Sequence, residues 1–143
     1  MSGFFGCVSR NECVNGVFYG TDYHSHLGTK RAGMAFAKDG VFTRSIHSLE
    51  DGYLRNKFES ELPKFGDATM GIGIISDKEA QPITVTTPIG RYAVVTVARI
   101  DNIEELTKEL LAEGHHFAEL SGSTINATEL VAILIGQGKS IKD

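Results

Sequence analysis

Ser2, which follows the initiator methionine directly, has the clearest potential for chemistry in this chain. The side chain of Ser2 is small, so we expect Met1 to be removed, which leaves a serine with a free α-amine. Such an amine titrates near pH ~8 and is partly neutral at pH 7. It can therefore act as the general base for the serine's own hydroxyl. In the alternative interpretation, which position alone favours, Ser2 is an exposed residue before a strand.

Two histidine pairs are the next candidates, because imidazole is a common metal ligand. His24 and His26 are separated by one residue, and His115 and His116 are adjacent. Residues two apart in a helix do not share a face, and no HExxH-type spacing joins the pairs. We therefore expect no metal or other cofactor and interpret these histidines as solvated or hydrogen-bonded.

The segment Gly71-Ile72-Gly73 superficially resembles part of a nucleotide-binding loop. A dinucleotide fingerprint needs a further glycine and a position between a strand and a helix, and neither is present here. The glycines instead favour a strand that another backbone or a ligand approaches closely.

Composition limits the classes of function. The 143 residues suffice for one domain, and the net charge of −4 gives no basic surface for nucleic acid or an anionic membrane. No apolar run approaches the ~18 residues of a spanning helix, so we expect no membrane partner and a cytoplasmic protein. The two cysteines, Cys7 and Cys13, match neither a disulfide framework nor a CxxC metal site.

The elements that must position these residues form a mixed α+β pattern. We expect strands over residues 3–8, 32–38, 41–47, 68–75, 83–87 and 91–100, and helices over residues 14–27, 50–62, 103–113 and about 126–135. The dipeptide Asp39-Gly40 between two apolar runs predicts a hairpin turn. Strands in adjacent runs favour antiparallel pairing, and the absence of repeats and linkers favours one domain, residues 1–143.

Helix boundaries are predicted from the usual signals. Gly28 and Pro63 should end the first two helices, and Asn102 can cap the third. The apolar stripes place three leucines of the third helix and three aliphatic residues of the fourth on buried faces: Leu106, Leu110, Leu111, Leu130, Leu134 and Ile135.

Read in order, several segments resemble the class II glutamine amidotransferase domain, as found in the amino-terminal half of amidophosphoribosyltransferases. The start, Met1 to Gly6, is similar to that family's Met-Cys-Gly-Ile-Phe/Val-Gly. Residues 19–35 resemble its Tyr-Gly…Gln-His-Arg-Gly-Gln-Glu…Ala-Gly-Ile-Ala stretch, with His26 and Gly28 matching. Residues 71–73 and 80–82 resemble its Gly-Ile-Gly…Asn-Ala-Gln-Pro passage, and residues 104–110 and 127–131 resemble the two helices that follow.

The resemblance implies an N-terminal-nucleophile (Ntn) hydrolase fold, an αββα sandwich with antiparallel sheets, incomplete at the C-terminus of this chain. It implies glutamine hydrolysis at the terminal residue, here Ser2, and transfer of ammonia to a phosphoribosyltransferase-type (glycosyltransferase) domain downstream or in trans. The implied substrate-binding positions are His26, Gly73, Arg99 and Asn126. We also expect a homo-oligomer.

This chain departs from the family at each anchoring position. Serine replaces the cysteine nucleophile, and Ile74-Ile75-Ser76-Asp77 replaces a His-x-Arg-Tyr segment whose arginine grips the glutamine carboxylate. Arg99-Ile100-Asp101 stands at the Asn-Gly oxyanion donors, the loss of one of which typically costs ~100- to 1,000-fold in rate. Asn126 replaces the aspartate that meets the substrate amine.

Two hypotheses follow. In the first, the chain is a glutaminase-like domain that uses Ser2 on a small-molecule amide or amino acid, with weak or lost glutaminase chemistry. In the second, it is a pseudoenzyme, a non-catalytic module that keeps the fold to bind a ligand or partner. The departures favour the second for chemistry, and the segment order favours the first for ancestry. The chain is either an amino-terminal piece of a longer protein or a reduced version whose open sheet edge a partner covers.

Overall fold

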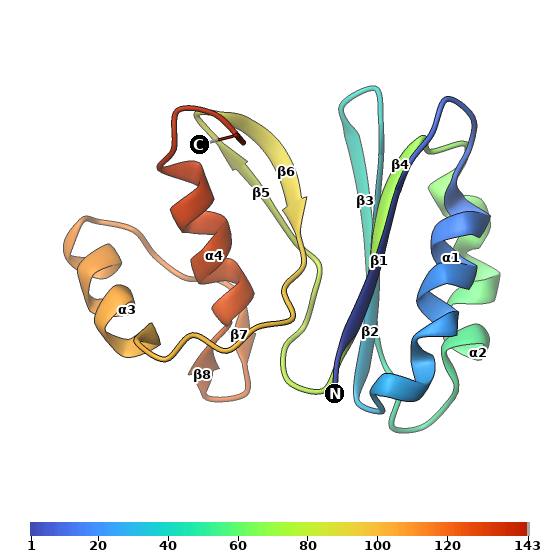
Figure 1. Ribbon diagram of the computed structural model, residues 1–143, viewed down its shortest axis with the longest axis horizontal. Coiled ribbons are helices and arrows are strands. Elements are labelled where there is room, and N and C mark those ends of the chain that lie inside the picture. Colours follow the sequence, from blue (N-terminus) through green and yellow to red (C-terminus); the bar gives the residue numbers. More distant parts are fainter. Residues whose placement is uncertain (143) are drawn as a thin grey trace.

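The chain folds into four layers, helix, sheet, sheet and helix, in a computed structural model that describes residues 1–142, with backbone alone at Leu120 and Ser121 (Figure 1). The strands are β1 (Gly3–Val8), β2 (Arg31–Lys38), β3 (Val41–Ser48), β4 (Met70–Ser76), β5 (Ile83–Thr87), β6 (Gly90–Val94), β7 (Leu120–Ser121) and β8 (Thr124–Ile125). The α-helices are α1 (Val14–Tyr23), α2 (Leu54–Phe58), α3 (Ile103–Ala112) and α4 (Ala127–Gly136). Two 3₁₀ helices, η1 (Ser25–Leu27) and η2 (Glu59–Phe65), follow α1 and α2.

The larger sheet is antiparallel throughout and has the order β1-β4-β2-β3. Helices α1 and α2 cover its outer face (Figure 1), where the main core contains Val17, Phe18, Met34, Phe36 and Phe58, each at most 2% exposed. The Asp39-Gly40 turn joins β2 to β3, as predicted. Both residues have positive φ, 50° and 78°, the conformation that a two-residue hairpin turn requires.

Glycines in β4 allow α1 to approach the sheet closely. A β-carbon on Gly73 would lie 1.9 Å from the Thr21 hydroxyl, and one on Gly71 would collide with Phe36. The glycines of this strand do admit close neighbours, as the sequence predicted, but these are side chains and not a backbone or ligand: Thr21 of α1 at Gly73 and Phe36 of β2 at Gly71.

The second half of the sandwich is smaller. The β5-β6 hairpin faces the larger sheet, and α4 packs behind it with α3 further out (Figure 1). Its core centres on Ile83, Tyr92 and Ala132, and the Tyr92 hydroxyl donates to the Ala132 carbonyl oxygen at 2.7 Å. No helix among the described residues is long and apolar enough to cross a membrane.

Several predicted boundaries were wrong. The expected strand over residues 91–100 ends at Val94, because its partner β5 begins at Ile83, the residue paired with Val94. The Gln81 side chain then bonds the backbone of Thr96 in place of a further strand residue, with Thr96 N–H donating to Gln81 Oε1 at 2.7 Å and Gln81 Nε2 donating to Thr96 O at 3.1 Å.

Predicted features of the helices were also wrong at several residues. The first α-helix ends at Tyr23, and Gly28 instead follows the short η1 segment. Pro63 does not stop the second helix but lies inside η2, whose hydrogen-bond pattern tolerates it. Leu111 is 51% exposed and Leu134 36% exposed, so neither is buried as predicted. Asn102 occupies the N-cap position of α3 but its side chain makes no capping hydrogen bond.

Candidate functional site

Ser2 lies immediately before β1, at the edge of the larger sheet and at the end where β4 leaves it. The β1–β4 register pairs Gly3 with Ile75. Continued outward, this register places Ser2 opposite Ser76 and Met1 opposite Asp77. Ser2 is partly exposed and Ser76 is buried. The terminus therefore meets the first residues of the loop that follows β4, residues 76–82, called here the 76–82 loop.

The Asp77 carboxylate holds the terminal ammonium. Oδ2 lies 2.6 Å from the Met1 nitrogen, while Oδ1 accepts the backbone N–H groups of Thr29 at 2.8 Å and Lys30 at 3.3 Å. The hydrogen bond from the terminal ammonium, followed by the one from Thr29, lowers the pKa of Asp77 below its ordinary value. Asp77 thus fastens the chain start to the segment that leads into β2.

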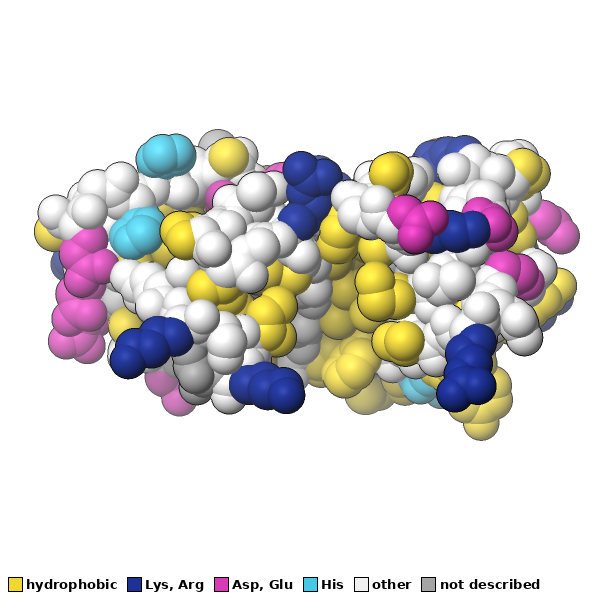
Figure 2. All heavy atoms as spheres, turned by 90° about the horizontal axis from the view of Figure 1, so that it is seen from above, with side chains coloured by type: hydrophobic (Ala, Val, Ile, Leu, Met, Phe, Trp, Pro, Cys, Tyr) yellow, Lys and Arg dark blue, Asp and Glu magenta, His cyan; other side chains and the backbone are white. Residues whose placement is uncertain are grey.

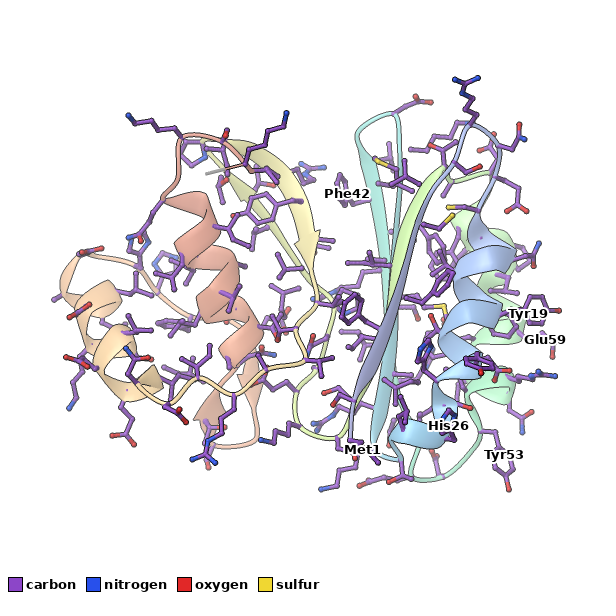
Figure 3. All side chains as sticks on the ribbon, viewed as in Figure 1. Met1, Tyr19, His26, Phe42, Tyr53 and Glu59 are labelled. Atoms are coloured by element: carbon purple, nitrogen blue, oxygen red, sulfur yellow. The ribbon has the colours of Figure 1, made fainter. Side chains whose placement is uncertain are left out.

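Residues 24–28 form the other wall around the chain start (Figure 3). A β-carbon on Gly3 would lie within 3.3 Å of Leu27 and His24, and one on Gly28 would lie 2.9 Å from the Met1 carbonyl oxygen. The His24 Nδ1 lies 2.7 Å from the Gly20 carbonyl oxygen, which fixes the ring at the end of α1. The glycines at positions 3 and 28 therefore let the two backbones pass closely.

A cation faces the same side of the sheet as Ser2. Arg31 pairs with Ser76 in the β2–β4 register, and directly opposed residues of antiparallel strands lie on one face. The Arg31 guanidinium donates from Nη1 to the Lys78 carbonyl oxygen at 2.7 Å. The register thus places three residues next to one another on one face of the sheet: Ser2, Ser76 and Arg31.

The 76–82 loop is held in place by a dense polar network. The Ser76 hydroxyl accepts the N–H groups of Lys78 and Glu79, which shapes the turn. The Glu79 carboxylate accepts the N–H groups of Ala127 at 2.8 Å and Thr128 at 3.1 Å at the start of α4. A carboxylate is favourable at a helix N-terminus, where N–H groups lack intrahelical partners. The loop is therefore a rigid connection between the sheet and α4.

Asn126, one of the predicted substrate contacts, lies in this network. The Asn126 side chain is fully buried; its Oδ1 accepts the N–H groups of Thr128 and Glu129, and its Nδ2 donates to the Ala80 carbonyl oxygen at 2.8 Å. The structure thus places Asn126 as the N-cap of α4 and as a support of the loop.

The other predicted substrate contacts lie in different surroundings. His26 is exposed in η1, beside the chain start, and its Nδ1 lies 2.9 Å from the Tyr23 carbonyl oxygen. Gly73 lies in mid-strand and faces α1. Arg99 is 85% exposed and its Nε lies 2.9 Å from an Asp101 carboxylate oxygen. The structure thus brings the His26 segment to Ser2 and joins Asn126 to the site through the loop.

A separate apolar cleft lies between the two sheets at their other end. It has a volume of about 440 Å³ and is lined mainly by small and apolar residues of the inner face, among them Gly6, Ala35, Phe42, Met70 and Ala93. Figure 2 shows hydrophobic side chains gathered in the furrow between the two halves, and Figure 3 shows Phe42 there. The described residues contain no group of three or more histidine, cysteine, aspartate or glutamate side chains able to hold a metal ion.

The four layers, two antiparallel sheets between two helical layers, match the Ntn-hydrolase fold of phosphoribosylpyrophosphate (PRPP) amidotransferases. The PRPP amidotransferase from B. subtilis superimposes with a TM-score of 0.78 over 97% of this chain and 30% of that one, at 20% identity. A structure described as the allosteric regulatory enzyme of purine biosynthesis gives 0.80 over the same shares, at 21% identity.

The sequence relationship agrees with the fold. The chain is homologous to the amidophosphoribosyltransferase of Methanocaldococcus jannaschii, with 28% identity over 153 aligned positions that cover 99% of this chain. No family model matches. The chain spans about a third of the length of these relatives, 32% of the sequence relative and 30% of each solved chain. The predicted family resemblance and fold are therefore confirmed.

Sequence reasoning did not identify Asp77 and Arg31 as parts of the site. Asp77 is visible in the sequence only as a departure from the family pattern, and no local motif marks Arg31. The strand registers find them, because they place Ser2, Ser76 and Arg31 in one row and Met1 opposite Asp77.

Proposed function

We propose that this chain is the glutaminase-type domain of an amidophosphoribosyltransferase-like protein, with Ser2 as its nucleophile once Met1 is removed. The observation that carries the proposal is the position of Ser2. It precedes the edge strand of an Ntn-hydrolase fold, is partly exposed, and adjoins a loop that already binds an ammonium group.

The proposed reaction starts with the free amine of Ser2. This amine takes the proton of the Ser2 hydroxyl, and Oγ attacks the carbon of an amide substrate. The C–N bond breaks, ammonia leaves with a proton returned by the amine, and water then hydrolyses the acyl-serine to the acid. Serine is a weaker nucleophile than cysteine near neutral pH, and the exposed Arg99–Asp101 pair offers no prearranged oxyanion donor. Glutaminase activity should therefore be weak or lost.

The partner in this proposal is a phosphoribosyltransferase-type domain, downstream or in trans, that consumes the ammonia. The support is the length of the relatives, because this chain matches only about a third of each. In the same proposal, the protein is a homo-oligomer, and His26, Gly73, Arg99 and Asn126 remain the substrate-binding set.

Three matched proteins test the nucleophile: wild type, Ser2→Ala and Ser2→Cys, each with loss of Met1 verified by intact mass. Each is incubated with an electrophilic glutamine analogue, and ammonia release from L-glutamine is measured. We expect an adduct on Ser2 in wild type, none at residue 2 of Ser2→Ala, and faster ammonia release from Ser2→Cys. If neither wild type nor Ser2→Cys formed the adduct or released ammonia, the catalytic proposal would be refuted.

A second candidate is a non-catalytic module that binds a ligand or partner. The apolar cleft of about 440 Å³ between the sheets favours it, since ligand sites are concave and mostly apolar. If Ser2→Ala removed an enzymatic activity without lowering the stability of the fold, this second candidate would be wrong.

A further inference from the structure

The floor of the apolar cleft is formed by two rows of residues on the larger sheet. The strand registers place the members of each row opposite one another: Gly6, Ile72 and Ala35 in one row, and Val8, Met70, Ala37 and Phe42 in the other. Directly opposed residues of antiparallel strands lie on the same face of a sheet. Because the glycine and the alanines have no side chain beyond a β-carbon, room remains above the sheet, and the volume of about 440 Å³ is typical of ligand sites.

The opposite wall of the cleft comes from β6. Arg91 and Ala93 both line the cleft, and residues two apart in a strand share a face. Tyr92, between them, lies on the other face, where its hydroxyl donates to the Ala132 carbonyl oxygen of α4. The β6 wall therefore presents one methyl group and one guanidinium to the cleft.

The Arg91 guanidinium bridges the two halves at the β2–β3 turn without pairing with an acid. Its Nε donates to the Thr86 hydroxyl at 3.1 Å, and its Nη1 donates to the Gly40 carbonyl oxygen at 3.4 Å. Within the described part of the chain these are the partners of Arg91, and neither is a carboxylate. A guanidinium carries five N–H donors, so the Nη2 N–H groups remain available to an anion.

The charge of the cleft restricts the kind of anion. Among the described residues that line it, Arg91 alone is charged. A phosphate monoester carries about −1.5 to −2 at pH 7, more than one cation neutralises. A carboxylate carries a single charge and matches the fork of a guanidinium. Charge complementarity therefore favours a monocarboxylate, and the apolar floor favours an apolar body attached to it.

We propose that the apolar cleft binds a small amphipathic monocarboxylate, with its carboxylate on Arg91 and its apolar body over the two floor rows. This assignment rests on the second candidate function and names its ligand class. It does not involve Ser2, which precedes the first residue of β1, whereas Val8 of the cleft is the last. Ligand binding here is thus independent of hydrolysis at the chain start.

Octanoate is the probe, and octanol and octylammonium are matched ligands with the same chain length and a different charge. Two-dimensional NMR titrations of the full chain measure both the affinity and the location of binding. Arg91→Gln removes the charge and keeps a donor for the Thr86 hydroxyl. Ala93→Leu narrows the cleft, since Ala93 is only partly buried and lines it. Lys108→Gln, which removes the same unit charge from the exposed surface of α3, is the matched control.

We expect octanoate to shift the amide signals of the cleft strands and to bind more tightly than octanol, with octylammonium weakest. Arg91→Gln should weaken octanoate binding by roughly tenfold, the usual effect of losing a charged hydrogen bond, and leave octanol binding unchanged. Ala93→Leu should weaken the binding of both octanoate and octanol. Lys108→Gln should weaken neither.

Equal affinities for octanoate and octanol, or equal effects of Arg91→Gln and Lys108→Gln, would overturn the carboxylate assignment and leave the cleft as an apolar ligand site. The comparison of the two ligands on wild type does not depend on the folding of any variant. If neither ligand bound, the second candidate function would also lose its support. Cleft signals that shifted with protein concentration alone would show a second copy of the chain there and would likewise overturn the assignment.

Discussion

At the residue scale, Glu61 joins the larger sheet to its helical cover. The Glu61 carboxylate accepts hydrogen bonds from Ser45, from His47 Nε2 at 3.0 Å and from Lys64 Nζ at 3.1 Å. Burial alone would raise the pKa of Glu61, but the three hydrogen bonds outweigh it and lower the pKa from 4.5 to about 2. The ionised form is thus the one that the fold stabilises.

This lowered pKa predicts a pH-dependent stability. The contribution of Glu61 is fully present above its unfolded pKa of 4.5 and is lost as pH falls from there toward 2. We expect about 1–2 kcal/mol of the unfolding free energy to disappear across this window, after allowance for solvent screening. Denaturant titrations between pH 6 and pH 2.5 measure it.

Glu61→Gln should flatten that pH dependence and lower stability at pH 6. Glu59→Gln, an exposed acid in the same 3₁₀ helix, should leave the slope unchanged. If the two variants gave the same slope, Glu61 would not be the group that titrates.

Ser2 could be found from the sequence because its signal is positional: a small hydroxyl residue directly after the initiator methionine. Asp77 and Arg31 could not, because they are 75 and 29 positions from Ser2 and become its neighbours only through two strand registers. Register depends on which strands pair, and this information is non-local.

At the scale of elements, the two asparagines that precede α3 and α4 make different contributions. Asn126 caps α4 through two backbone N–H groups and is fully buried, whereas Asn102 makes no side-chain capping bond. We expect Asn126→Ala to cost about 1–3 kcal/mol of unfolding free energy, because it leaves buried donors of α4 and the Ala80 carbonyl oxygen without this partner.

The matched variant is Asn102→Ala, whose expected cost is at most a few tenths of a kcal/mol. Chemical denaturation of both variants at one pH compares them. Equal losses of unfolding free energy in the two variants would show that the side-chain contacts of Asn126 do not account for the loss.

The elements that followed from the sequence are those with local signals, such as the turn at Asp39-Gly40 and the strand at residues 83–87. The end of β6 could not be foreseen. Residues 95–100 are rich in β-branched residues, as strands are, but a strand exists only while it has a partner, and that partner begins at Ile83. Likewise, exposure of Phe4, at 57%, depends on whether another layer covers the edge strand.

At the scale of the whole molecule, the two halves have unequal cores. Among the described residues, the core under α1 and α2 contains twelve buried residues, and the core between α4 and the β5-β6 hairpin contains three. Polar contacts between the two halves include the Arg44–Glu119 ion pair at 3.0 Å and the hydrogen bonds that the first N–H groups of α4 donate to Glu79. The second half thus has fewer apolar contacts to resist opening.

We therefore predict that native-state hydrogen exchange is slowest in β2 and β4 and faster in β5, β6 and α3, as expected for a sub-global opening of the smaller half. Exchange measured by mass spectrometry or NMR over a low denaturant series tests this. Identical opening free energies in both halves would contradict it and indicate one cooperative unit.

The ion pair between the Met1 ammonium and Asp77 also has a consequence for how preparations of this protein behave. Molecules that keep Met1 and molecules that have lost it differ at the chain start, and in the proposed function only the second group has the free serine amine that the reaction needs. Specific activity should therefore follow the processed fraction, not the folded fraction. A weakly active batch would first call for an intact mass measurement, because incomplete maturation by aminopeptidase would mimic a poor catalyst.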